Sequence, residues 1–343
     1  MNCPEHGPTV RAVPWARHAA GHTVAFDEQV AWLATQCSKS ATCELMRIAW
    51  RTVGAIITRV WDDVEKVHDR LAGLRRIGID EISYKRGHRY LTVVVDHDSG
   101  RLVWAAPGRD QATRRGFFDE LGPERAAVIT HVSADQAGWI ADVVTERCPR
   151  AVRCADPFHI VRWATDALDE VRRQTWNDAR RSGQTTSNGR GRRDASGDAR
   201  RMKNTRYALW KNPENLSSRQ QDKLAWIATT SPRLHRAHLL KEGLRLVFRL
   251  DADEAPTALD KWVAWARRSR IPSFVYLQRR IVKHRFSILA AIEHGLSNGR
   301  IESVNTKIRL ITRIAFGFRS PQALIALAML SLGSHRPTLP GRP

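Results

Sequence analysis

Three acidic residues, far apart in the chain, have the surroundings expected of metal ligands. Asp80 lies inside a short apolar segment, RRIGIDEIS, which is typical of a buried strand. Asp135 closes a second apolar run, AAVITHVSAD, and Glu302 opens a helix after a turn in LSNGRIESVN. A carboxylate inside a central strand is costly to desolvate unless a charged partner compensates it. We therefore expect these three carboxylates to meet and to hold divalent metal ions.

Each acid also has a simpler structural interpretation. Asp135 can cap the helix that follows it, and Glu302 can favour a helix N-terminus by its charge alone. Glu81 can be the ligand in place of Asp80, because neighbours on a strand point to opposite faces and only one can face the metal. The metal interpretation is preferred because the positions of the three acids, taken together, fit the expected order of strands.

The elements around these acids predict the sheet that must position them. In chain order we expect strand, strand, strand, helix, strand, helix and strand, at residues 75–83, 90–96, 101–106, 111–121, 127–133, 137–147 and 151–154. A hairpin turn at Asp98-Ser99-Gly100 joins the second and third strands. This order, with right-handed crossovers, is that of an α/β, ribonuclease-H-like mixed sheet.

In such a sheet the first strand is central and the fourth lies beside it, so Asp80 and Asp135 are expected side by side. Their position would be the carboxyl edge, where open α/β sheets bind ligands. Two like charges a few Å apart repel unless a cation joins them or they share a proton. Mg²⁺ prefers oxygen ligands and keeps waters, which suits carboxylates and a phosphate, and Mn²⁺ can substitute for it.

A helical pattern over residues 26–66 favours a helix-turn-helix ahead of this sheet. Ser40 is expected to cap a short helix and Thr52 a longer one. The longer helix has a buried stripe at helical spacing, made of Val53, Ile56, Ile57, Val60 and Val64. Three polar residues lie off this stripe and are expected to face DNA: Arg51, Thr58 and Arg59.

The charge of the chain indicates a polyanionic partner. Lys and Arg number 56 against 35 acidic residues, which gives a formal net charge of +21 over 343 residues. Nucleic acid is the commonest partner for so large an excess, and a basic surface that serves only solubility is the alternative. Hydrophobic residues make up 42% of the chain, enough for a sizeable core and more than one domain.

Several classes of protein are disfavoured. No apolar run approaches the roughly 20 residues of a membrane helix, and the polar, proline-containing N-terminus is unlike a signal peptide. The five cysteines are scattered, so no disulfide framework is expected, and we expect a cytoplasmic protein. Cys3 and His6 have the spacing of half a zinc site, but a tetrahedral site needs four ligands, so we expect no structural zinc.

A long region separates Asp135 from Glu302. Its first part, RRSGQTTSNGRGRRDASGDARRMKNTR, is either a solvated linker or a loop that orders on a phosphate backbone. Residues 207–290 have a mostly helical pattern, as an insertion in the catalytic fold or a subdomain packed on it. Beyond them, Glu302 and Asn305 form an i, i+3 pair on one helix. Basic residues of this last segment, expected at DNA, are Lys307, Arg309, Arg313 and Arg319.

Several motifs, in this order, carry a family resemblance: CPEHG with VPWA, ELMRIAWRTVGAIITRVW, GIDEISYKRGHRYLTVVVD, the Gly108-Arg109 pair, VSADQ, DPFHIVRWATDALDEVRR and SNGRIESVNTKIRLITRIAFGF. From about Cys3 to its end, the chain resembles the ISL3 family of bacterial insertion-sequence transposases, which are DDE enzymes. The family usually begins with a zinc-binding element whose first cysteine pair lies upstream of a CP-x-H-like half. The sequence resembles a member without that upstream part, by truncation or because Met1 is not the native start.

The resemblance implies Asp80, Asp135 and Glu302 as the catalytic triad, with Asp156 and His159 beside the site. His159 can contact substrate, hydrogen-bond a carboxylate, or be structural. Two metal ions bridged by Asp80 are expected to activate a water and then a 3′-hydroxyl for in-line attack on phosphorus. The partners implied are double-stranded DNA, as terminal inverted repeats and target, and further copies of the chain on that DNA.

Two other functions fit parts of the sequence. The helix-turn-helix and the charge suffice for a DNA-binding protein without catalysis, such as a self-repressor or a decayed transposase. A related nuclease or resolvase would hydrolyse DNA without joining it. The expected parts are a zinc-element remnant at 1–24, the helix-turn-helix at 25–70, the first part of the catalytic core at 71–180, a basic loop and helical insertion at 181–290, the catalytic and closing helices at 291–335, and a tail at 336–343.

Overall fold

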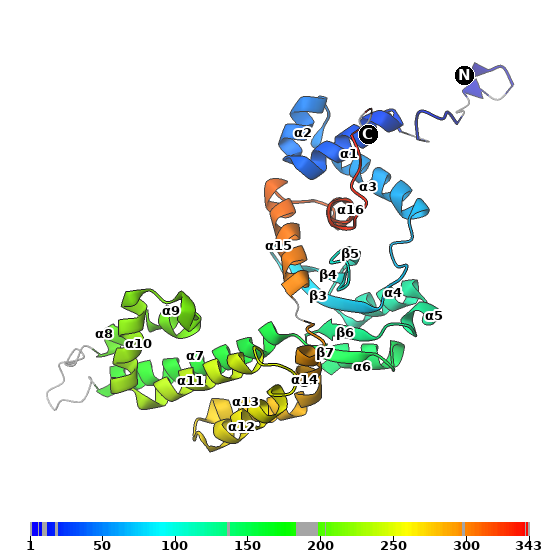
Figure 1. The fold of residues 1–343 in the computed structure, drawn as a ribbon. Helices are drawn as coiled ribbons and strands as arrows, with labels where there is room; N and C mark the ends of the chain where they lie inside the picture. Colours follow the sequence, from blue (N-terminus) through cyan, green and yellow to red (C-terminus); the bar gives the residue numbers. More distant parts are fainter. Residues whose placement is uncertain are drawn as a thin grey trace. The chain divides into compact units, whose positions relative to one another are not determined.

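The computed structural model describes residues 2–5, 7–8, 12–17, 20–135, 138–182, 198–202, 204–296, 299–339 and 341. The chain divides into two compact units (Figure 1). The first unit comprises Met1–Val132, Ala137–Ala151 and Gly299–Pro343, and the second comprises Ser133–Gln136 and Val152–Asn298. Within the described part of the chain, no helix has the length and apolar character needed to cross a membrane.

Three helices near the N-terminus pack on one another as the helix-turn-helix pattern predicts (Figure 1). They are α1 (Val24–Gln36), α2 (Lys39–Met46) and α3 (Trp50–Val67). The tight joint between α2 and α3 contains Arg47 in the left-handed conformation, at φ 52°. The expected stripe of α3 is buried at Val53, Ile56, Ile57 and Val60, while Val64 is only partly buried.

The two helix caps expected in this region are wrong. Ser38, rather than Ser40, caps α2, because Ser38 has extended backbone and its hydroxyl accepts a hydrogen bond from the Ala41 amide at 3.1 Å. Ser40 lies inside the helix. Helix α3 begins two residues before Thr52, after Ala49, and has no side-chain cap. Both serines of the sequence SKS suit a cap, so only the start of the helix distinguishes them.

A five-stranded mixed sheet forms the centre of the fold, with strand order β5-β4-β3-β6-β7. Its strands are β3 (Arg76–Lys85), β4 (Arg89–Asp96), β5 (Leu102–Pro107), β6 (His131–Ala134) and β7 (Val152–Ala155). The hairpin pairs antiparallel, with Asp80 opposite Val93. The expected first strand is therefore central with the fourth beside it, and the ribonuclease-H-like fold class is confirmed.

The fourth strand is shorter than expected. Residues 127–133 were expected to be extended, but α5 (Pro123–Ala126) and its closing turn occupy the chain up to Ile129. Gly122, at φ 82°, and Pro123 at the first helical position start this turn. The strand begins only where the amides of Thr130 and His131 donate to the Arg75 carbonyl.

The rest of the first unit covers the sheet and joins it to the helix-turn-helix. The remaining helices are α4 (Gln111–Leu121), α6 (Gly138–Arg147), α15 (Gly299–Ile314) and α16 (Pro321–Leu332). Helix α16 packs on both α3 and β5. One continuous apolar core therefore includes side chains of the N-terminal helices, the hairpin, α15 and α16.

The second unit is mainly helical and has its own apolar core. Its elements after β7 are α7 (Pro157–Ser182), α8 (Asp198–Met202), α9 (Thr205–Trp210), a short 3-10 turn η1 (Pro213–Asn215), α10 (Ser218–Thr230), α11 (Pro232–Val247), α12 (Ala255–Arg268), α13 (Pro272–Lys283) and α14 (Arg285–Glu293). The expected basic loop falls largely on residues 183–197, outside the described residues, but its last part is helical in α8 and α9.

At the N-terminus, β1 (Asn2–Cys3) and β2 (Gly7–Pro8) form a short antiparallel ladder. The expected zinc remnant lies outside the described side chains, because neither the Cys3 side chain nor His6 is among them.

Candidate active site

The two neighbouring acids of β3 point to opposite faces and have different partners. Glu81 forms an ion pair with Arg114 of α4, whose side chain is only 2% exposed. Asp80 accepts a hydrogen bond on Oδ2 from Nδ2 of Asn305 at 2.7 Å, and Asn305 belongs to α15. Asp80 is thus the acid that faces the helix carrying Glu302, and Glu81 is held by a cation on the other side.

A close approach between β3 and α15 makes this hydrogen bond geometrically possible. A Cβ atom at Gly78 would lie 2.1 Å from Cδ1 of Ile301 and 2.8 Å from Nε2 of His97. Any side chain at this position would therefore force Ile301 and His97 to move. The start of α15 is also held by Arg300, which donates hydrogen bonds to the carbonyls of His97 and Asp98. The buried stripe of α15 is Ile301, Val304 and Ile308.

Glu302 and Asn305 occupy successive turns of α15 and differ in burial. Glu302 is exposed in the first turn of the helix, whereas Asn305 is 2% exposed. Among the described residues, none donates a hydrogen bond to Oδ1 of Asn305, although this oxygen is buried. A buried oxygen without a donor is unusual, and it adds an acceptor to the carboxylate oxygens of Asp80.

The donor chemistry of this group fits a hard divalent cation. Asp80, Glu302 and Asn305 offer only oxygen atoms, apart from the amide nitrogen already used between Asn305 and Asp80. Mg²⁺ and Mn²⁺ prefer such ligands. No group of three His, Cys, Asp or Glu side chains in the described ranges is arranged to hold a metal ion.

A second acidic group lies at the start of α7, in the second unit. Nδ1 of His159 is 3.0 Å from Oδ1 of Asp135 and 3.8 Å from Oδ2 of Asp156. Asp156 is buried and accepts a hydrogen bond from the Phe158 amide at 3.0 Å, so it caps the helix. His159 therefore contacts a carboxylate, which was one of its three interpretations, and α7 fixes its position.

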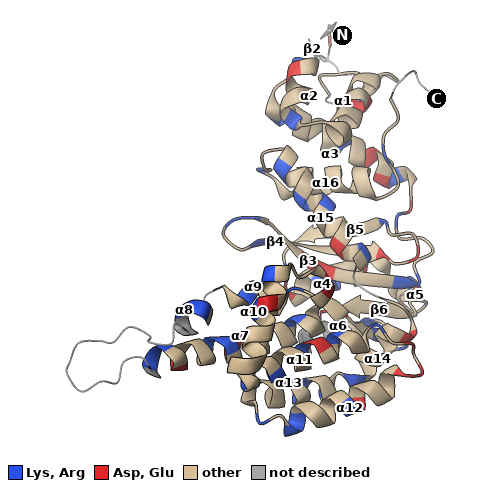
Figure 2. Ribbon diagram, turned by 60° about the vertical axis from the view of Figure 1, so that its left-hand side comes forward, with Lys and Arg blue, Asp and Glu red and all other residues tan. Residues whose placement is uncertain are grey.

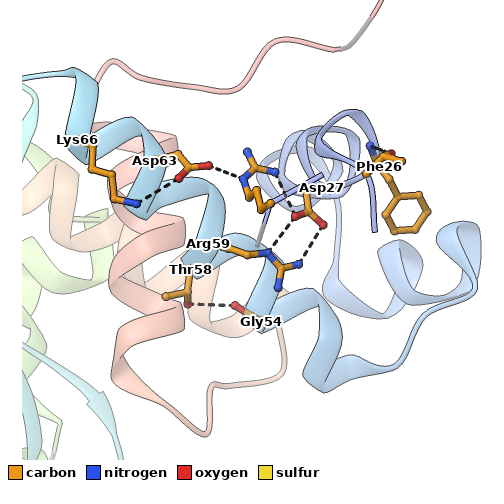
Figure 3. A network of polar contacts seen from close by, with 9 residues as sticks. Phe26, Asp27, Gly54, Thr58, Arg59, Asp63 and Lys66 are labelled. Atoms are coloured by element: carbon orange, nitrogen blue, oxygen red, sulfur yellow. Dashed lines mark hydrogen bonds and ion pairs between the residues drawn. The ribbon is translucent and has the colours of Figure 1, made fainter. Parts of the chain in front are cut away.

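The residues of α3 that were expected to contact DNA differ in whether they already form hydrogen bonds within the protein. Arg59 donates two hydrogen bonds, at 3.0 and 3.1 Å, to the carboxylate of Asp27 in α1, and Asp27 is fully buried (Figure 3). Thr58 donates to the Gly54 carbonyl at 3.1 Å (Figure 3). Arg51 is exposed. The role of Asp27 was missed, because an acid in the first turn of a helix usually needs no buried partner.

The other expected basic residues lie in the C-terminal segment of the first unit. Figure 2 shows Lys and Arg along α15, where Lys307, Arg309 and Arg313 are exposed. Arg319 is exposed in the turn before α16. Their charges are available to a polyanion on the surface of this unit.

A ribonuclease-H-like sheet that follows an N-terminal helix-turn-helix is the architecture expected of a DNA transposase of the DDE class. Residues 77–328 match the DDE family of ISL3 elements, described as "Transposase", and residues 11–61 match the "Helix-turn-helix domain of transposase family ISL3". This chain therefore belongs to the ISL3 family of transposases.

Named relatives are similar over most of the chain. The "Transposase for insertion sequence element IS1557" of two Mycobacterium tuberculosis strains is 70% identical over 350 residues, covering 100% of this chain and 79% of the relative. The "Transposase for insertion sequence element IS1001" of Bordetella parapertussis is 26% identical over 320 residues, covering 92% of this chain and 75% of the relative.

Proposed function

We propose that this transposase cuts insertion-sequence ends and joins them to target DNA with Asp80, Asp135 and Glu302 as its metal-holding carboxylates. The single observation that carries the proposal is the hydrogen bond from Asn305 to Asp80. It fixes the strand acid on the side where α15 also carries Glu302. Mg²⁺ is the proposed ion and Mn²⁺ its substitute, since every donor offered is a hard oxygen.

The protein's own residues orient the reacting groups. Asn305 helps to orient the Asp80 carboxylate, and its Oδ1, to which none of the described residues donates, is a further acceptor for a bound water or ion. His159 is a positioning residue for Asp135, and Asp156 fixes His159 by starting α7. When bound, the ions supply Lewis acidity to the phosphoryl oxygen and make water or a 3′-hydroxyl a better nucleophile.

The basic residues of the first unit are proposed to bind the DNA backbone. Arg51 and Thr58 of α3 would contact the terminal inverted repeats. The exposed cations of the C-terminal segment would contact the DNA nearer the chemistry, and these are Lys307, Arg309, Arg313 and Arg319. Arg59 would reach a phosphate only with the part of its guanidinium that Asp27 leaves available. We further propose that two or more copies of the chain act together on the two ends, on DNA in the cytoplasm.

The test is a strand-cleavage and joining assay on a supercoiled plasmid that carries the element's ends. Asp80→Asn, Asp135→Asn and Glu302→Gln should each abolish Mg²⁺-dependent nicking and joined products while end binding persists. Asp142→Asn, an exposed acid on α6, is the matched control and should keep wild-type activity. Wild-type cleavage by Asp80→Asn would refute the assignment, and nicking without joined products would indicate a nuclease.

A further inference from the structure

A groove in the first unit is built by segments far apart in the sequence. It is lined by the start of α2, the first half of α3, the end of β3 and the turn between α15 and α16. Its volume is about 990 Å³, at the upper end of the range of roughly 300–1,000 Å³ for small-molecule sites. None of the residues proposed to hold metal lines it, so it is separate from the carboxylate site.

One wall of the groove presents an aromatic ring to solvent. Phe316, in the turn after α15, is 81% exposed and has φ 51°, a left-handed conformation that is uncommon for a residue with a bulky side chain. Gly317 follows it at φ 93°. Backbone of this kind persists where the surrounding structure holds it, and it is frequent in functional sites. The turn therefore keeps an apolar ring out of the core.

The floor of the groove contains a buried cation. Lys39 is 8% exposed, and its Nζ lies 4.9 Å from the centroid of the Trp50 ring and 5.5 Å from that of Phe318. Across the described residues, no hydrogen bond or ion pair engages this Nζ. Burial lowers the pKa of Lys39, so an anion in the groove would stabilise its charged form.

The rim of the groove adds further positive charge. Arg51, Lys85 and Arg319 all line it and are exposed. No acidic residue belongs to the lining, and in the described part of the chain none of these three cations forms an ion pair. An occupant must therefore carry negative charge and offer a flat apolar face to Phe316. A nucleotide has both features.

We propose that this groove binds an unpaired nucleotide of a DNA strand, with its base stacked on Phe316 and its phosphate against Lys39. In a duplex the faces of each base are covered by its neighbours, so stacking on a side chain requires a base that is terminal, displaced or single-stranded. The rim cations would continue along the backbone of the same strand. This inference rests on the DNA-binding part of the proposed function and not on the metal site.

The test compares two DNA probes by fluorescence anisotropy in metal-free buffer. One is a short blunt duplex, and the other is the same duplex with a few unpaired thymidines at one 3′ end. Wild type should bind the overhang more tightly. Phe316→Ala should weaken overhang binding by roughly tenfold, as expected for loss of one stacked base, and should leave blunt binding unchanged. Phe316→Trp should restore it.

Matched variants make the result interpretable. Phe286→Ala removes a ring that is 75% exposed in the second unit and should change neither affinity. Lys39→Gln should weaken overhang binding and reduce its dependence on salt. Equal binding of both probes by wild type, or equal weakening of both by Phe316→Ala, would overturn the proposal. So would competition by free thymidine monophosphate as effective as that by the overhang strand, which would indicate a mononucleotide site.

The outcome is independent of the catalytic assignment. Asp142→Asn, the control of the cleavage assay, should bind the overhang as wild type does, because Asp142 does not line the groove. If the proposed metal-holding residues are wrong, only the cleavage assay will show it. If the groove proposal is wrong, only the anisotropy assay will show it.

Discussion

Asn305 donates a hydrogen bond of 2.7 Å to Asp80 across 225 positions of the sequence. The bond joins the central strand to the helix that bears Glu302, and both residues belong to one compact unit. The neutral amide of Asn305 therefore helps to orient the Asp80 carboxylate. A neutral donor adds no positive charge of its own to the carboxylate that it orients.

Loss of the Asn305 amide should impair the reaction more than the fold. Asn305→Ala removes the donor to Asp80, and we expect cleavage to slow by about 10- to 100-fold with a higher Mg²⁺ requirement, as for other supports of metal ligands. Cleavage rates over a Mg²⁺ titration measure this. Thr306→Ala, an exposed neighbour on the same helix, is the control. An unchanged Mg²⁺ requirement in Asn305→Ala would contradict the role given to this bond.

The ion pair between Arg114 and Glu81 should matter for stability. Arg114→Ala leaves Glu81 partly buried without its cation, and because Glu81 is 26% exposed we expect a loss of about 2 kcal/mol, less than for a fully buried pair. This corresponds to a fall in melting temperature of roughly 4–8 °C. Arg115→Ala breaks an exposed pair with Glu146, at 2.9 Å, and should cost under about 1 kcal/mol.

A double variant of Arg114 and Glu81 tests the same ion pair more strictly. Arg114→Ala combined with Glu81→Ala removes the uncompensated charge, so part of the lost melting temperature should return. If the single and double variants melt at the same temperature, the pair is not what stabilises the α4 face of the sheet.

Alanine variants of Arg51 and Arg59 should differ: the first should lower DNA affinity, and the second should lower the stability of the helix packing. Arg51→Ala should weaken binding of the terminal repeats and reduce the slope of log K against log salt by about 1, with no change in melting temperature. Arg59→Ala deprives the buried Asp27 of a partner, so it should lower the melting temperature by several degrees. Affinity over a salt series and thermal melting together measure both effects. A stable Arg59→Ala protein would show that Arg17, which also pairs with Asp27, suffices.

Buried His97 should make the first unit sensitive to acid. Burial, and then the charges of Arg300 and Arg76, lower the pKa of His97 from 6.5 to about 4, although Asp96 and Asp98 oppose the shift. The unfolded chain therefore binds this proton more readily than the folded protein. Its contribution to stability is complete above about pH 6.5 and is lost as pH falls toward 4, by up to about 3 kcal/mol.

Melting temperatures measured between pH 7 and 4 check this expectation. His97→Gln should flatten the decline relative to wild type, even if it is less stable at pH 7. His88→Asn, on the exposed turn between β3 and β4, is the control and should keep the wild-type slope. Parallel curves for wild type and His97→Gln would contradict the assignment.

Local patterns in the sequence were enough for most elements. Helix α4 has the predicted ends, and the predicted central strand is β3, because hydrophobic spacing and flanking turns act within a few residues. The same local reasoning misplaced the caps of α2 and α3 and the start of β6. At those positions several residues suit the same role, and tertiary packing chooses among them.

The sequence by itself determined that acids lie on the central strand, after the fourth strand and on a late helix. It could not choose between Asp80 and Glu81, because alternation along a strand assigns opposite faces without saying what covers each. Only the tertiary structure shows which side chain lies against each acid: Arg114 pairs with Glu81, and Asn305 bonds to Asp80. Likewise, the sequence placed Arg59 on a polar surface, whereas folding brought it to the buried Asp27. Partners so distant along the chain are selected by packing, which no local pattern contains.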